Sequence, residues 1–238
     1  MRIPMFPFLL LLCGCAAGFD RAALQERLKD GSTHMPDADI AAVRDLKPQL
    51  RFPCRVAVHL QGGTGDWRWT PEDKAAMEVW AGALKKEGIA ADVFPLPEML
   101  AGKGNDVKEL RLAAAKCGAD VLFVVRGAAD TDRYMNPLSV FNLTVVGGFV
   151  VPGSSRDSLF VVEGVLMDVD NGYVYTGVQA EGVGKIMRPT FVIEDKDAIA
   201  KAKALALAQF GDEALKRMRA LKAAPVYISD VPAVVPTP

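Results

Sequence analysis

The sequence contains few metal-binding residues and has no excess of charge of one sign. It has 2 histidines and 4 cysteines among 238 residues, and 28 Lys+Arg balance 29 Asp+Glu. Two histidines and separated cysteines make a poor zinc-binding set, so we expect no metal and no cofactor. A nearly neutral chain lacks the basic surface that DNA or RNA attracts, and we expect no nucleic-acid partner.

The sequence begins with an apolar stretch that is too short to cross a bilayer. Residues 3–12 follow Arg2, contain Pro4 and Pro7, and are succeeded by small residues. A spanning helix needs about 20 apolar residues and tolerates proline poorly. The arrangement of a basic residue, a short apolar run and small residues is typical of a secretory signal, which is removed.

The end of this stretch, Leu12-Cys13-Gly14-Cys15, resembles the lipobox of bacterial lipoproteins. The resemblance implies that residues 1–14 are removed and that Cys15 becomes the acylated N-terminus. Several acyl chains, at about 0.8 kcal/mol per buried methylene, hold a protein stably on a membrane. Ala16, in place of the Asp that signals inner-membrane retention, implies the outer membrane. We expect the periplasmic face, with the cell surface as the alternative. An ordinary secreted protein with a chance cysteine remains the alternative.

Strands and helices alternate in the first half of the chain. Three strand patterns and two helix patterns are present, at residues 54–60, 91–96 and 120–127, and at 70–88 and 107–119. The first helix has Thr70 as N-cap, Pro71 in its first turn and Gly88 past its end. Right-handed crossovers place the first strand between the second and the third.

The second half predicts antiparallel strands and a closing helix. Residues 158–184 form a hairpin pattern around Asn171-Gly172, with Val165 expected opposite Val178 and Met167 opposite Thr176. A long helix is predicted over residues 195–222, with one apolar side: Ile199, Ala202, Ala206, Phe210, Ala214, Met218 and Leu221.

The predicted fold class is therefore α/β. A three-stranded parallel β-α-β-α-β core is extended by antiparallel strands, including the Asn-Gly hairpin, and is closed by the C-terminal helix. Residues 51–222 make the domain. Residues 15–50 form a lipidated tether with short helices, and residues 223–238 form a proline-rich flexible tail.

Two cysteines besides Cys15 remain in the expected mature chain. Cys54 precedes the first strand and Cys117 ends the helix that leads into the third, so both lie at the same end of neighbouring strands. A Cα separation below about 7 Å is plausible there, and the compartment implied by the signal is oxidising. We predict a Cys54–Cys117 disulfide, with two buried thiols as the alternative.

The order of elements after Arg51, with the phrases GADVLFVVRG and LMDVDNGYVYTGVQAEG, resembles bacterial periplasmic lipoproteins with an α/β domain of the curli-secretion-channel and TolB-N-terminal type. Rhombotarget-type lipoproteins are also similar, although their C-terminal processing signal is not evident in VPAVVPTP. The resemblance covers residues 51–222. It implies a binding or assembly role in the envelope without an active site.

Candidate partner residues lie in the loop after the first strand. Trp67, Arg68 and Trp69 are of the types enriched in interface cores, and they could form a partner surface. A tryptophan that caps the sheet edge is the alternative. The GGTG sequence in the same loop fits neither phosphate-binding glycine pattern, so it predicts a plain loop.

The best available acid/base or cation set consists of His59, Asp66, Asp130 and Asp132, which are expected near the carboxyl ends of strands. A solvated acidic loop would explain the aspartates equally well. No nucleophile motif accompanies them, so we expect no enzyme. A small-ligand enzyme that uses these carboxylates is one alternative.

Residues 141–152 are apolar and rich in glycine, and they predict either a core strand or a contact with lipid or a neighbouring subunit. The expected function is that of a membrane-anchored, non-catalytic accessory or assembly component. It would act through unidentified envelope proteins and possible homo-oligomers. A ring- or pore-forming secretion subunit is the other alternative.

Overall fold

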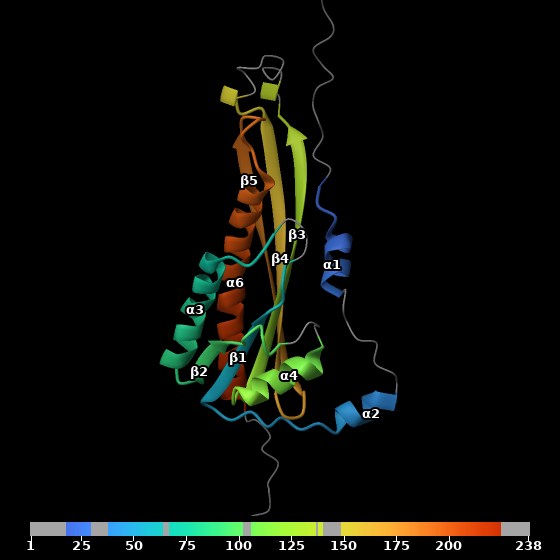
Figure 1. Ribbon diagram of the computed structural model, residues 1–238, viewed down its shortest axis with the longest axis vertical. Coiled ribbons are helices and arrows are strands. Elements are labelled where there is room, and N and C mark those ends of the chain that lie inside the picture. Colours follow the sequence, from blue (N-terminus) through green and yellow to red (C-terminus); the bar gives the residue numbers. More distant parts are fainter. Residues whose placement is uncertain are drawn as a thin grey trace, which may run out of the picture.

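The computed structural model describes residues 18–29, 38–63, 67–101, 106–136, 138–139 and 149–224. Cys15, Asp66, residues 141–148 and most of the C-terminal tail lie outside these ranges. The helices and strands, in chain order (Figure 1), are α1 (Arg21–Lys29), α2 (Ala38–Arg44), β1 (Cys54–Leu60), α3 (Pro71–Lys86), β2 (Ala90–Pro95), α4 (Val107–Lys116), β3 (Val121–Met135), β4 (Ser154–Asp168), β5 (Val174–Arg188) and α6 (Asp195–Ala223).

All five strands form one sheet in the order β2-β1-β3-β4-β5. β1 runs parallel to β2 and to β3, whereas β3, β4 and β5 are antiparallel neighbours. The predicted fold class is confirmed, including the place of the first strand between the second and third. Within the described residues, no helix combines the length and the apolar character that a membrane span requires.

β3 is much longer than the sequence pattern predicted. It pairs with β1 only from Val121 to Val125, yet it continues alongside β4 as far as Met135. Asp130 and Asp132 therefore lie inside a strand, which corrects their placement in a loop after it. The pattern broke off at residue 127 because polar residues follow, but an antiparallel partner strand supplies their hydrogen bonds.

Helices cover both faces of the sheet (Figure 1). On one face, α3 and α6 bury Phe160 and Val162 of β4 in the main core cluster. On the other face, α1 covers Leu159 and Val161, and α4 packs over the lower half of the sheet. Successive side chains of a strand point to opposite faces, so β4 is buried on both of its sides.

α3 begins and ends as the sequence predicted. Thr70 and Asp73 form a capping box at its start, and Gly88 adopts a φ of 64° just after its end. Its buried row is Asp73, Met77, Trp80 and Leu84. The alanine-rich helix offers several apolar rows, and Val79 lies outside the buried one, because it is 76% exposed.

The hairpin forms between β4 and β5, but the predicted register is wrong by one residue. Val178 pairs with Gly164 and Thr176 pairs with Leu166, and the register shifts again just before Met167. The cause lies in the turn, where the buried Asp168 carboxylate accepts hydrogen bonds from the backbone N–H groups of Asp170 and Asn171. A two-residue turn does not contain this arrangement.

α6 lies unusually close to β5. A Cβ atom added at Gly182 would lie 2.2 Å from the Ala202 carbonyl oxygen, and one at Gly184 would lie 2.3 Å from that of Ala198. Glycines on the strand and alanines on the helix therefore let the two backbones approach. The predicted buried side of this helix is confirmed from Ile199 to Met218.

We expect Gly182→Ala to destabilise the protein by about 1–3 kcal/mol, because an added methyl group overpacks a closed contact. Gly177→Ala, on the same strand, is the control, since the nearest atom to its added Cβ lies 3.9 Å away. Urea denaturation followed by circular dichroism measures both. Equal free energies of unfolding for the two variants would contradict the close packing.

Candidate functional site

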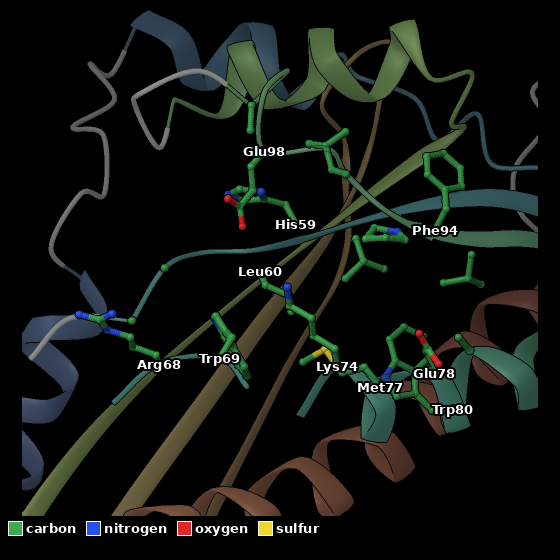
Figure 2. A pocket seen from close by; sticks show the side chains of 18 residues that line it. His59, Leu60, Arg68, Trp69, Lys74, Met77, Glu78, Trp80, Phe94 and Glu98 are labelled. Carbon is green, nitrogen blue, oxygen red and sulfur yellow. The ribbon is translucent and has the colours of Figure 1, made fainter. Parts of the chain in front are cut away.

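A cavity of about 680 Å³ opens where β1 and β2 end and α3 begins. Its apolar walls include Trp69, Trp80 and Phe94, and its charged or titratable groups are His59, Arg68, Lys74, Glu78 and Glu98 (Figure 2). In α/β folds, ligands bind at the carboxyl ends of parallel strands. The cavity can therefore accept a molecule with an apolar body and charged groups of either sign.

His59 is the imidazole of this cavity, and Glu98 lies beside it (Figure 2). Burial lowers the pKa of His59, and the negative charge of Glu98 opposes that shift. The neutral imidazole is therefore favoured near pH 7, with one nitrogen able to accept a hydrogen bond. Glu98 was missed in the sequence, although its position just after β2 would place it at this edge.

The predicted acid/base set is not assembled. His59 is the register partner of Val124 on β3, and Asp130 lies six residues further along that strand. At about 3.3 Å per residue, roughly 20 Å separate the two levels of the sheet. Asp66 lies outside the described residues. The carboxylates of β3 and the imidazole of β1 therefore do not share a site.

Asp130 and Asp132 bind the N-terminal segment instead. The Gly18 N–H donates to the Asp132 carboxylate at 2.9 Å, and the Asp20 N–H donates to the Asp130 carboxylate at 3.0 Å. Asp20 in turn accepts a hydrogen bond from the Ala23 N–H at 2.9 Å in the first turn of α1. The two aspartates thus attach the chain that enters α1 to the upper part of β3.

α1 is also held by apolar and ionic contacts. Leu24 and Leu28 are buried against β3 and β4, and burying a leucine contributes roughly 1.5–3 kcal/mol. Arg21 forms an ion pair with Glu181 of β5, and the Arg27 guanidinium donates to the Ala129 carbonyl at 3.1 Å. Residues 18–29 are therefore packed on the domain.

The loop before α3 places Trp67 in the core and packs Trp69 against it. Trp67 is 5% exposed and meets the Phe160 ring edge-on, with 4.8 Å between ring centroids. The Trp69 indole N–H donates to the Gln61 carbonyl at 2.7 Å, and Trp69 is half-buried. Of the predicted partner surface, Trp67 is a core residue, while Arg68 is exposed and lines the cavity beside Trp69.

A buried ion pair fixes the same loop. Lys203 of α6 and Asp73 of α3 are both almost completely buried and form a salt bridge. The Lys203 ammonium also donates to the Arg68 carbonyl at 2.8 Å. Removing one member of such a pair leaves a buried charge without compensation. No local pattern could have predicted this contact, since 130 residues separate Asp73 and Lys203 along the chain.

Both cysteines of the described domain are free, and the predicted disulfide is absent. Cys54 belongs to the core cluster beneath α3 and α6, whereas Cys117 packs against the cluster beneath α4. The two thiols lie at one end of the sheet, as expected, but on opposite faces of it. Burial raises the pKa of Cys54 to about 12.

The sequence matches no family model and no curated protein. Among solved structures, it is similar to a PelC dodecamer from Paraburkholderia phytofirmans (18% identity, TM-score 0.30, covering 70% of this chain and 94% of that one). It is also similar to a minor lipoprotein from Acinetobacter baumannii (8% identity, TM-score 0.36, covering 71% of this chain and 93% of that one). A third similar structure is that of lipoprotein GNA1162 from Neisseria meningitidis (12% identity, TM-score 0.36, covering 71% of this chain and 99% of that one). Similarities this weak assign neither a family nor a function.

We expect the stability of the protein to fall as the pH drops below the ordinary His59 pKa of 6.5. In that range His59 is protonated to a greater extent in the unfolded chain than in the folded protein, so the unfolded state binds more protons. Urea denaturation between about pH 7.5 and 5.5 measures this loss, and His59→Gln should show a smaller one. An identical pH dependence in both proteins would contradict the lowered pKa.

We expect a thiol reagent to modify Cys117 in the native protein well before Cys54. Cys117 is partly exposed, whereas Cys54 is fully buried and its raised pKa suppresses the reactive thiolate. Peptide mapping after brief maleimide labelling measures the ratio, with urea-unfolded protein as the control in which both react. A Cys54–Cys117 disulfide in the non-reduced map would contradict the arrangement.

Proposed function

We propose that the protein is a lipid-anchored envelope lipoprotein whose domain acts without catalysis, by binding other envelope proteins. One observation carries the proposal: the chain three residues beyond Cys15 is bonded to the sheet through Gly18 and Asp132. An anchor attached this way holds the folded domain itself at the membrane. Residues 18–29 therefore act as a docked connection between the anchor and the sheet.

The attachment also defines which end of the domain is held. Three residues span at most about 11 Å, so the Cα atom of the acylated Cys15 lies within that distance of Gly18. Gly18 is bonded to the upper half of β3, beyond the part that pairs with β1. α4 and the turn between β4 and β5 lie lower on the domain (Figure 1), and the cavity opens at the ends of β1 and β2, so envelope partners could reach them.

The roles of the titratable groups support a non-catalytic function. Asp130 and Asp132 accept hydrogen bonds from main-chain N–H groups, and they attach α1 rather than face the cavity. His59 lies about 20 Å away along the sheet. The residues that could have formed a carboxylate and imidazole site thus serve two separate parts of the structure.

We expect Cys15→Ser to be lost from the outer-membrane fraction, because the acyl chains that hold the protein there cannot be attached. Cys117→Ser is the matched control and should fractionate as the wild type does, since Cys117 lies within the domain. Immunoblots of separated membranes and mass spectrometry of the amino terminus measure the outcome. A Cys15→Ser protein that stays in the outer membrane, or an unmodified wild-type terminus, would contradict the anchor.

A partner should be recovered by crosslinking the wild-type protein in cells and identifying the proteins bound to it. We expect specific envelope proteins in the wild-type sample that are missing from Cys15→Ser, because the domain must be held at the membrane to meet them. Recovery of the same proteins with both would show that membrane attachment does not direct the contact.

A further inference from the structure

An exposed apolar surface, here called the apolar tip, lies at the end of the sheet where β3 and β5 finish and α6 begins (Figure 1). Each of its residues is at least 43% exposed; they are Met135, Leu138, Phe149, Val150, Met187, Phe191 and Val192. Of the segment 141–152, residues 141–148 lie outside the described part of the chain, and Phe149 and Val150 are exposed rather than buried in the core.

The apolar tip is built by contacts between its segments. The rings of Phe149 and Phe191 lie 4.9 Å apart between centroids, which joins the segment ahead of β4 to the turn before α6. The Asn136 side-chain amide donates to the Pro152 carbonyl at 2.7 Å, and the Asn136 N–H donates to the Gly153 carbonyl at 3.1 Å. Large apolar groups are thus held together at a surface where water meets them.

The same end of the domain carries the connection to the anchor. Gly18 is bonded to Asp132, which lies three residues before Met135 on β3. Three strand residues rise about 10 Å, and the three residues from Gly18 back to Cys15 span at most about 11 Å. The distance from Gly18 to the apolar tip is therefore about the same as the greatest distance from Gly18 to the acylated Cys15.

The charges next to the apolar tip are paired within the protein. Asp195 forms ion pairs with Arg133 and Arg156, and Asp197 forms one with Arg188. Bacterial membrane surfaces are commonly anionic, and unpaired carboxylates would be repelled from them. Because arginines neutralise these two carboxylates, charge does not oppose the approach of the tip to lipid headgroups.

We propose that the apolar tip inserts into the headgroup region of the membrane that holds the acyl chains. This inference rests on the proposed anchor at Cys15 and adds a second contact, made by the protein itself. Exposed aromatic and aliphatic side chains beside an anchor partition into that region. The long strands then point away from the membrane, and β3, with 15 residues, spans roughly 50 Å.

The test uses the acylated full-length protein in phosphatidylethanolamine and phosphatidylglycerol vesicles with brominated acyl chains, which quench tryptophan fluorescence. Phe191→Trp reports on the apolar tip, and Leu112→Trp on α4 is the control with matched exposure, 58% against 57%. Each is compared with the parent protein, which contains 3 tryptophans. We expect the added tryptophan of Phe191→Trp to lose most of its emission and that of Leu112→Trp to keep it.

Equal quenching of the two variants would overturn the proposal. Protection of the Phe191→Trp fluorescence from aqueous acrylamide without quenching by bromolipid would place a second copy of the chain on the apolar tip, and would overturn it too. Met187→Trp provides a second position if Phe191→Trp does not fold. Failure of the anchor itself appears earlier, as missing acyl mass on the purified protein, so the two failures are distinguishable.

Discussion

β3 is about twice as long as β1, and this difference in length decides how the N-terminal segment and the two covering helices are placed. β3 continues to Met135 although its pairing with β1 ends at Val125. Together with β4 and β5, it forms an upper sheet without β1 or β2 beside it, and this sheet needs a helix on each face. α6 covers one face through the close approach at Gly182, and α1 covers the other by burying Leu24. The N-terminal segment is thereby part of the core.

This cover fixes the segment that leads to the proposed anchor against the fold. A free tether would let the domain rotate in all directions at the membrane surface, as flexible linkers do. Here Asp130 and Asp132 bind the backbone just ahead of α1, and Arg21 pairs with Glu181 on β5. Each contact is modest, because water and salt weaken ion pairs and hydrogen bonds at an exposed surface. Together with the burial of Leu24, they fix residues 18–29 in one position on the domain.

Local signals in the sequence predicted most of the elements, and distant contacts account for what was missed. β1 was predicted from its apolar residues, α3 from Thr70 and Gly88, and the sheet order from the handedness of crossovers. The end of β3 was missed because polar residues inside a strand look like a loop until their partner strand is known. The hairpin register depended on the hydrogen bonds accepted by Asp168, and the Lys203–Asp73 pair joins segments remote in sequence. No local pattern encodes such contacts.

The same reasoning explains why the candidate sites changed. Trp67 was expected to face a partner because aromatic residues are common in interfaces, but Phe160 and the small Gly127 make a place for it in the core. The carboxylates of β3 were expected at a strand end, and the true strand end lies beyond them, at Met135. Because β3 continues to Met135, the exposed apolar surface lies at the same end of the domain as the Gly18 attachment. The length of one strand thus determines both what binds α1 and what the domain presents beside the proposed anchor.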